Sequence, residues 1–249
     1  MQVTKYNASG NDFVIFHTFV KKPRNSLAKL LSNRQESIGA DGLIVLVPHG
    51  GYDFEWEFYN SDGSDAQMCG NGSRAAAHYA VTNGLCEKKM RFLTIAGVIE
   101  ASVEGDEAEV KLTEPKILDN MIISGGHKWQ LIDTGVPHLV TFVDDLKLFD
   151  KEIASEMRNT HNANVNFAKI DTQNRTVHVR TYERGVEDET LACGTGIAAC
   201  FYAAYLNNDV DEMTKAYPLS KEELTLSYKD GYIYFKGRVY KVFETSITL

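Results

Sequence analysis

CGNGSRAAAHYA, residues 69–80, returns as CGTGIAACFYAA at residues 193–204, an offset of 124 positions (193 − 69). The repeat extends upstream, because SGNDFVIF around Gly10 matches TGVPHLVTF around Gly135 at an offset of 125 (135 − 10). YNSDGSDAQMCGNG also matches YERGVEDETLACGTG with one inserted residue. Self-similarity over such a long period predicts two domains of the same fold. A pseudo-twofold axis between them would bring equivalent positions face to face.

The chain length is compatible with two domains. With 249 residues, each half has about 120 residues and is large enough to bury its own core. We place the boundary near Thr113–Asn120, where a proline and a polar run interrupt the strands. The expected domains are residues 1–116, which carry Cys69, and residues 117–237, which carry Cys193.

Short β-rich runs dominate the sequence, and few segments are helical. Two expected helices start just after Cys69 and Cys193 and end at Asn83-Gly84 and Asn207-Asn208. Both are rich in alanine and other small residues, which is typical of helices packed on all sides, so each should form the core of one half. Two further helices are expected at Ser26–Asn33 and Asp150–Arg158. The expected strands are Phe13–Phe16, Leu43–Val47, Phe54–Tyr59, Arg91–Ile95, Glu107–Leu112, Leu139–Val143, Asn166–Ile170, Val177–Tyr182, a hairpin of Leu224–Tyr228 and Tyr232–Lys236 turning at Asp230-Gly231, and Arg238–Ile247.

Charge and composition point to a small-molecule substrate. The formal net charge of −8 disfavours a surface that neutralises nucleic-acid phosphates. The first residues, MQVTKYNASGNDF, do not resemble a secretion signal, and the longest aliphatic run, Leu43–Val47, is far too short to cross a membrane. We therefore expect a cytoplasmic protein with no membrane partner. Its four cysteines are too sparse for a disulfide framework and lack Cys-x-x-Cys spacing, so they should be reduced thiols: Cys69, Cys86, Cys193 and Cys200.

The paired Cys-Gly-x-Gly motifs suit acid–base chemistry at a carbon atom. In each motif glycines allow a tight turn before a helix, and the start of that helix offers N–H groups and a positive dipole to an anion such as an α-carboxylate. Inverting an α-carbon without an imine-forming cofactor requires a base on one face and an acid on the other. A helix start contributes up to ~2 kcal/mol to an anion, enough to populate a thiolate from a thiol with a pKa of about 8.5. Donors aimed at the developing enediolate must supply most of the remaining barrier reduction.

A buried structural role is the ordinary alternative for any cysteine. Duplication of the whole motif favours catalysis for Cys69 and Cys193. Nothing comparable surrounds Cys86 or Cys200, so we interpret these two as core residues.

With these motifs in view, the sequence resembles the diaminopimelate epimerase family over nearly its whole length. The matching segments are GNDF at Gly10, GADG at Gly39, FYNSDGSDAQMCGNG, TGVPHLVTFVDD, NANVNF and YERGVEDETLACGTG. The resemblance implies a mixed α/β fold of two pseudo-symmetric domains, each a curved, mostly antiparallel sheet around a central helix. It also implies that the final strand, at about 238–249, returns to the N-terminal domain. The implied reaction converts LL-2,6-diaminopimelate to the meso isomer, for lysine and peptidoglycan precursors, without metal or pyridoxal phosphate.

The resemblance also implies roles for individual residues. Cys69 and Cys193 correspond to the two acid/base thiols, and His138 and Glu183 to residues placed beside them. The distal end of the substrate carries its own carboxylate and ammonium groups, which suit Arg184 and Glu183 respectively. The implied substrate-binding residues are Asn11, Asn60, Gly70, Asn71, Asn164, Glu183, Arg184, Gly194 and Thr195. One departure is Val136, where many family members have Asn, which removes one amide from the expected contacts to the distal carboxylate.

Alternative readings remain open at this point. A proline or hydroxyproline racemase of the same fold would share the two thiols but not the residues expected at the distal end. An isomerase of the phenazine-pathway type would lack the paired cysteines. A non-catalytic thiol switch or zinc-binding protein would use Cys69, Cys193 and His138. The sequence leaves both a monomer and a homodimer open.

Overall fold

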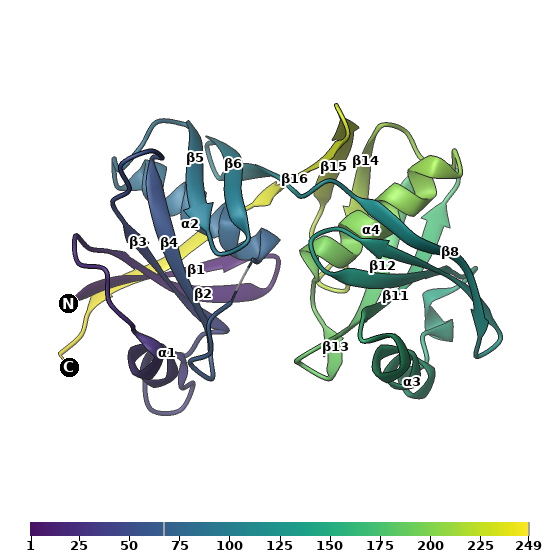
Figure 1. The fold of residues 1–249 in the computed structure, drawn as a ribbon, viewed down its shortest axis with the longest axis horizontal. Helices are drawn as coiled ribbons and strands as arrows, with labels where there is room; N and C mark the ends of the chain where they lie inside the picture. Colours follow the sequence, from purple (N-terminus) through teal and green to yellow (C-terminus); the bar gives the residue numbers. More distant parts are fainter. Residues whose placement is uncertain (67, 249) are drawn as a thin grey trace. The chain divides into compact units, whose positions relative to one another are not determined.

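The computed structural model describes residues 1–66 and 68–248, which form two compact units (Figure 1). The N-unit contains residues 1–110 and the C-terminal segment that begins at Lys236, and the C-unit contains Lys111–Phe235. The chain therefore passes from one unit to the other twice. The polar run that we expected to interrupt the strands does so only over residues 112–115, because a strand begins at Lys116.

Each unit consists of a sheet with two helices. The elements of the N-unit are β1 (Gln2–Ala8), β2 (Asn11–His17), α1 (Asn25–Ser32), β3 (Gly42–Val47), β4 (Phe54–Asn60), α2 (Gly70–Thr82), β5 (Lys89–Thr94), β6 (Gly97–Glu104), β7 (Glu107–Lys111) and β17 (Tyr240–Ser246). From the C-unit come β8 (Lys116–Ser124), β9 (His127–Asp133), β10 (Pro137–Phe142), a 3₁₀ turn (Leu146–Leu148), α3 (Lys151–His161), β11 (Asn164–Asp171), β12 (Thr176–Glu183), β13 (Asp188–Thr190), α4 (Gly194–Leu206), β14 (Met213–Tyr217) and β15 (Leu224–Lys229). Strand β16 (Tyr232–Arg238) begins in the C-unit and ends in the C-terminal segment of the N-unit.

Strand pairing follows the same plan in both units. In the N-unit the order is β17–β1–β2–β3–β4–β5–β6–β7, with β2–β3 and β4–β5 parallel and the other pairs antiparallel. In the C-unit β8–β9–β10–β11–β12–β14–β15 has β10–β11 and β12–β14 parallel and the other pairs antiparallel. The short β13 adds to the end of β12. The duplicated sequence therefore has a duplicated, mostly antiparallel topology, as predicted.

The two alanine-rich helices occupy the centres of their units, which confirms the predicted arrangement. Every residue from Gly70 to Ala80 in α2 is buried, and α2 packs against β1, β2, β3 and β6 (Figure 1). Helix α4 is buried in the same way against β9 to β12, β14 and β15. The predicted ends are also confirmed, with positive φ angles at Gly84 and Asn208. No helix in the described part of the chain is long and apolar enough to cross a membrane.

A second helix covers the other face of each sheet. Ala28 and Leu31 of α1 pack on Val14 and Val45, and Ala154 of α3 packs in the equivalent cluster of the C-unit. Because side chains alternate along a strand, the intervening residues face the central helix. Strands β2, β3, β10 and β11 therefore present alternate residues to the starts of α2 and α4.

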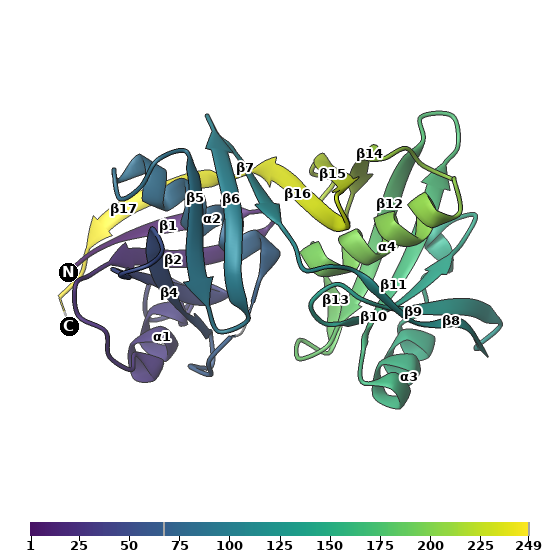
Figure 2. The ribbon, with the colours of Figure 1, turned by 45° about the horizontal axis from the view of Figure 1, so that its top comes forward.

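The C-terminal residues form a tight turn and a last strand. Asp230 and Gly231 both have positive φ, as the tight turn before β16 requires. Strand β17 pairs antiparallel with β1 and lies beside it in Figure 2.

Candidate active site

Each motif cysteine is the N-cap of a central helix. Cys69 has an extended backbone, its carbonyl accepts from the Ser73 N–H at 2.8 Å, and its sulfur accepts from the Gly72 N–H at 3.3 Å. Cys193 also has an extended backbone, and its carbonyl accepts from the Ile197 N–H at 2.9 Å. Both sulfurs therefore lie at helix starts, where N–H groups and the helix dipole favour a negative charge.

In the N-unit two predicted residues, Asn11 and Asn71, meet beside Cys69. The Asn11 side-chain oxygen lies 3.8 Å from the Cys69 sulfur and accepts from the Asn71 amide at 3.5 Å. The buried Arg74 in turn donates to the Asn71 side-chain oxygen at 2.7 Å. The sulfur therefore faces a carbonyl-type acceptor on Asn11.

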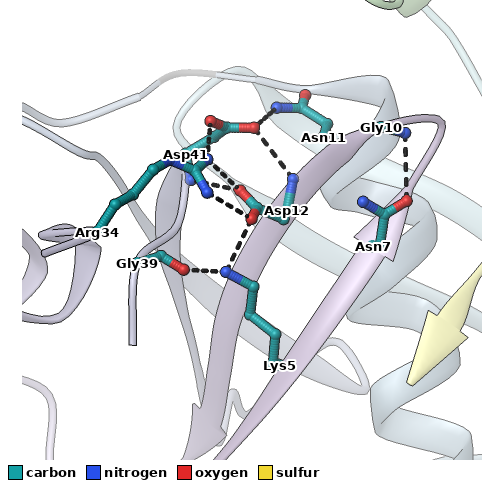
Figure 3. A network of polar contacts seen from close by, with 8 residues as sticks. All are labelled: Lys5, Asn7, Gly10, Asn11, Asp12, Arg34, Gly39 and Asp41. Carbon is teal, nitrogen blue, oxygen red and sulfur yellow. Dashed lines mark hydrogen bonds and ion pairs between the residues drawn. The ribbon is translucent and has the colours of Figure 1, made fainter. Parts of the chain in front are cut away.

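A charged network holds Asn11 in this orientation (Figure 3). The Asn11 amide nitrogen donates to Asp41 at 2.6 Å, and Arg34 bridges Asp41 and Asp12. Burial raises the pKa of Asp12, but its bonds to Arg34 and Lys5 outweigh burial and lower that pKa to about 2. The Asn11 amide nitrogen thus donates to Asp41, which leaves the Asn11 oxygen pointing to Cys69.

Asn60, at the exposed end of β4, makes a different contact. Its side chain donates to the Ser64 hydroxyl at 2.9 Å rather than to Asn11 or Asn71.

In the C-unit Cys193 adjoins Thr195 and His138. The Thr195 hydroxyl lies 3.7 Å from the Cys193 sulfur and 2.8 Å from His138 Nε2. The Thr134 hydroxyl donates to the Thr195 carbonyl at 2.8 Å and so holds the first turn of α4 in place. Burial, with a contribution from the charge of Arg184, lowers the pKa of His138 to about 3. His138 is therefore neutral near pH 7.

The remaining predicted residues lie at the ends of β11 and β12. The Asn164 side chain donates to the Pro137 carbonyl at 3.3 Å and accepts from the Arg184 backbone N–H at 2.8 Å. The Arg184 guanidinium donates to the Asn162 carbonyl at 2.8 Å. The Glu183 carboxylate accepts from Thr190 at 2.7 Å.

Sequence reasoning missed several residues that hold these groups in place. The amide of Asn166 contacts His138 Nδ1 at 3.2 Å, and the Thr181 hydroxyl donates to the Asn166 oxygen at 2.8 Å. A signal was present, because Asn164 and Asn166 are two residues apart in NANVNF and so share one face of β11. Asp41 was likewise contained in the GADG motif but was not singled out.

Within residues 1–66 and 68–248, no group of three or more His, Cys, Asp or Glu side chains is arranged to hold a metal ion.

Comparison with known proteins decides the family. The family model described as diaminopimelate epimerase matches residues 3–118 and 130–242. The chain belongs to the diaminopimelate epimerase family. A diaminopimelate epimerase from a Nitratiruptor species is 65% identical over 98% of both chains. One from Campylobacter jejuni subsp. doylei is 55% identical over 99% of this chain and 98% of the relative. This chain is accordingly an epimerase, a member of the isomerase class.

Solved structures confirm the fold class of this diaminopimelate epimerase family member. A probable proline racemase from Agrobacterium radiobacter K84, with bound carbonate, matches with a TM-score of 0.79 over 100% of this chain and 93% of that chain. Its sequence identity is 14%, so the similarity concerns the fold alone.

Proposed function

We propose that this chain converts LL-2,6-diaminopimelate to the meso isomer without a cofactor, using Cys69 and Cys193 as its acid and base. The observation that carries the proposal is that both motif cysteines cap the starts of the two duplicated central helices. Family membership supplies the substrate. A cytoplasmic location suits this chemistry, because that compartment keeps thiols reduced.

The reaction is a transfer of two protons. One cysteine, as thiolate, removes the α-proton from one face of the carbon, and the other, as thiol, delivers its proton to the opposite face. The substrate α-carboxylate gains enediolate character between these steps. Backbone N–H groups at Gly70-Asn71 and Gly194-Thr195 are suited to bind that charge. After one turnover the protonation states of the two thiols are exchanged.

Recognition of the distal end is assigned to the ends of β11 and β12. We assign the distal carboxylate to Arg184 with Asn164, and the distal ammonium to Glu183. The hydrogen bonds from the Arg184 backbone N–H to Asn164 and from the Thr190 hydroxyl to Glu183 support this assignment, because they hold both groups in place. Asn11 and Asn60 are the amide contacts we assign to the N-unit. Because Val136 has no side-chain amide, the contact that an Asn at this position would make to the distal end is assigned to the other residues named in this paragraph.

The test is an assay of purified protein with LL-diaminopimelate in deuterated water, followed by NMR. We expect loss of the α-proton signal together with formation of the meso isomer, both unchanged by a metal chelator. L-lysine, which lacks the distal carboxylate, and L-proline serve as matched controls and should show no exchange. Comparable exchange with lysine or proline would reject the assigned substrate and favour a racemase of broader or different specificity.

A further inference from the structure

A buried series of polar side chains leads to the Cys193 sulfur. We call Thr181, Asn166, His138 and Thr195 the α4 polar cluster. Thr181 contacts Asn166 at 2.8 Å, Asn166 contacts His138 at 3.2 Å, His138 contacts Thr195 at 2.8 Å, and Thr195 lies 3.7 Å from the sulfur. Asn166 and His138 are completely buried, and Thr181 is 3% exposed. Burying so many polar groups is costly unless they are hydrogen-bonded, so this cluster calls for a functional account.

The direction of every hydrogen bond in the cluster follows from one carbonyl group. The Asn166 amide lies 2.9 Å from the Leu139 backbone oxygen, which only accepts, so the Asn166 nitrogen must face it. The second proton of that nitrogen then points to His138 Nδ1, which must accept. The Asn166 oxygen is left to accept from the Thr181 hydroxyl.

The consequence reaches Cys193 through Thr195. Because Nδ1 of the neutral His138 accepts, its Nε2 carries the proton and donates to the Thr195 hydroxyl oxygen. The hydroxyl proton of Thr195 then points away from His138. The Cys193 sulfur, 3.7 Å from the Thr195 hydroxyl oxygen, is the acceptor beside it. A donor directed at a sulfur favours the thiolate over the thiol.

The N-unit adds an acceptor to the surroundings of its cysteine, whose sulfur also accepts from the Gly72 N–H at 3.3 Å. Asp41 binds the Asn11 amide nitrogen (Figure 3). The Asn11 oxygen, an acceptor, lies 3.8 Å from the Cys69 sulfur. An acceptor at this distance favours the protonated thiol, whose S–H can donate to it.

We infer that Asn166 is a positioning residue: it fixes the tautomer of His138, makes Thr195 a donor to Cys193, and thereby makes Cys193 the first of the two motif thiols to ionise. The inference rests on the proposed function only in naming the reaction that the ionised thiol serves. In the resting enzyme Cys193 is then the base and Cys69 the acid.

Other ionisable groups surround the cluster and must be kept constant in a test. Cys200, further along α4, is fully buried, and burial followed by the influence of Cys193 raises its pKa well above the usual value. Arg184 disfavours a proton on His138, and its sequence neighbour Glu183 accepts a hydrogen bond from Thr190. None of these residues is changed in the variants proposed here.

The experiment measures the pH dependence of alkylation by iodoacetamide at each cysteine, resolved by peptide mass spectrometry. The variants are Asn166→Leu, which removes the amide, and Thr181→Val, which is nearly isosteric and retains the test if the first variant does not fold. Thr141→Val is the matched control, because Thr141 is buried on the same strand as His138 but three residues along it, on the opposite face.

We expect Cys193 to ionise at lower pH than Cys69 in the unchanged protein. Asn166→Leu should raise the Cys193 midpoint by about one pH unit, the size expected for loss of a charge-assisted hydrogen bond, and Thr181→Val should raise it by less. The Cys69 midpoint and the control should not move. The acid limb of the kcat/KM profile should shift with the Cys193 midpoint.

The tautomer provides a readout that a merely structural role would not change. A ¹⁵N-detected correlation spectrum should show the Nε2–H form of His138, assigned among the seven histidines by loss of its signal in His138→Phe. Earlier ionisation of Cys69, or an unchanged Cys193 midpoint in folded Asn166→Leu or Thr181→Val, would overturn the inference. Because alkylation requires no substrate, failure to epimerise diaminopimelate would overturn the proposed function and leave these results to be judged separately.

Discussion

The N-unit and the C-unit share one topology but differ in the side chains beneath their central helix starts. Strand register defines three pairs of equivalent positions in the two units. One pair lies on β2 and β10, one on β3 and β11, and one on β4 and β12. Under α4 these positions hold His138, Asn166 and Thr181. Under α2 they hold Phe13, Ile44 and Phe58, with the two aromatic rings edge to face at 6.0 Å. Duplication has therefore retained the backbone and the capping cysteine while changing the electrostatic surroundings of the sulfur.

At the turns before β2 and β10 the comparison is reversed, because the polar side chain is in the N-unit and the apolar one in the C-unit. Asn11 follows the β1–β2 turn and is held by the charged network of Asp12, Arg34 and Asp41. Its counterpart at an offset of 125 is Val136, which has no amide to hold (136 − 11). Polar support for the thiol thus comes from a hairpin in one unit and from the sheet beneath the helix in the other. One fold can place an acceptor beside one cysteine and a donor beside the other.

The largest expected effect is loss of either motif cysteine. Cys69→Ala and Cys193→Ala should each reduce epimerisation by about 10³-fold or more, because a positioned acid or base contributes about 10² to 10⁴ and the remaining thiol serves only one face of the carbon. Conversion of LL- to meso-diaminopimelate by the purified variants is the measurement.

Circular dichroism and thermal unfolding would show whether each cysteine variant keeps its fold, as we expect. Near-normal turnover in either folded variant would remove that cysteine from the mechanism. The starts of α2 and α4 would then not have equivalent functions.

The duplication made most of the fold predictable. Both central helices were predicted because their alanine-rich sequence and Asn or Gly stops are local signals. Strand β8 was taken for a linker because Lys116–Asn120 is exposed throughout, so no alternation of apolar and polar residues marks it. Strand β1 was overlooked for a different reason: four consecutive buried residues, Val3–Tyr6, include Thr4 and Lys5, whose burial depends on tertiary partners.

The site was predictable where it lies in the motifs and not where it depends on strand register. Thr181 and Asn166 come together only because β11 and β12 pair in a particular register. Arg34 lies outside the motifs and reaches Asp12 only through the packing of α1 on the sheet. Such contacts join residues far apart in sequence, and no local pattern reports them.

The glycines of the two motifs provide a sharper comparison of the units. A Cβ at Gly196 would lie 2.3 Å from the Asn166 oxygen, which its bonds hold in place, whereas a Cβ at Gly72 would lie 3.3 Å from the tip of Ile44. Gly196→Ala should therefore cost about 1–3 kcal/mol by overpacking. Gly72→Ala should change stability by less than about 1 kcal/mol, since alanine's helix propensity offsets the tighter contact.

Denaturant unfolding of both glycine variants measures this difference. Because alanine keeps the backbone N–H, neither substitution removes a donor at the helix start. Equal costs at the two positions would mean that the α4 polar cluster is no more rigid than the apolar packing under α2.

The charged network of the N-unit should give that unit a pH dependence of its own. The folded pKa of Asp12, about 2, lies below its usual value of 3.8, so its contribution to stability is present above pH 4 and is lost as the pH falls towards 2. Asp12→Asn should cost about 2 kcal/mol near neutral pH, with the cost shrinking between pH 4 and 2. The counterpart position, Pro137, carries no charge (12 + 125).

Urea unfolding at a series of pH values, monitored separately for the two units where they unfold in separate steps, checks this. A cost for Asp12→Asn that stays constant down to pH 2 would show that the carboxylate does not titrate with the depressed pKa. The network would then stabilise the N-unit by packing alone.

The smallest effects should come from the two cysteines outside the motifs. Cys200 in α4 is completely buried at the position that Ala76 holds in α2 (200 − 124), so Cys200→Ala converts one central helix to the pattern of the other. Removing one buried sulfur should cost about 1 kcal/mol, and Cys86→Ala less because Cys86 is only partly buried.

Burial, with the charges of Asp53 and Glu87, raises the pKa of Cys86 to about 11. Both thiols are thus protonated at pH 8 and should alkylate slowly, leaving turnover unchanged in either variant. Loss of turnover at unchanged stability in one of them would transfer the acid/base role to a thiol without a helix start beside it, which the chemistry of thiolate stabilisation does not favour.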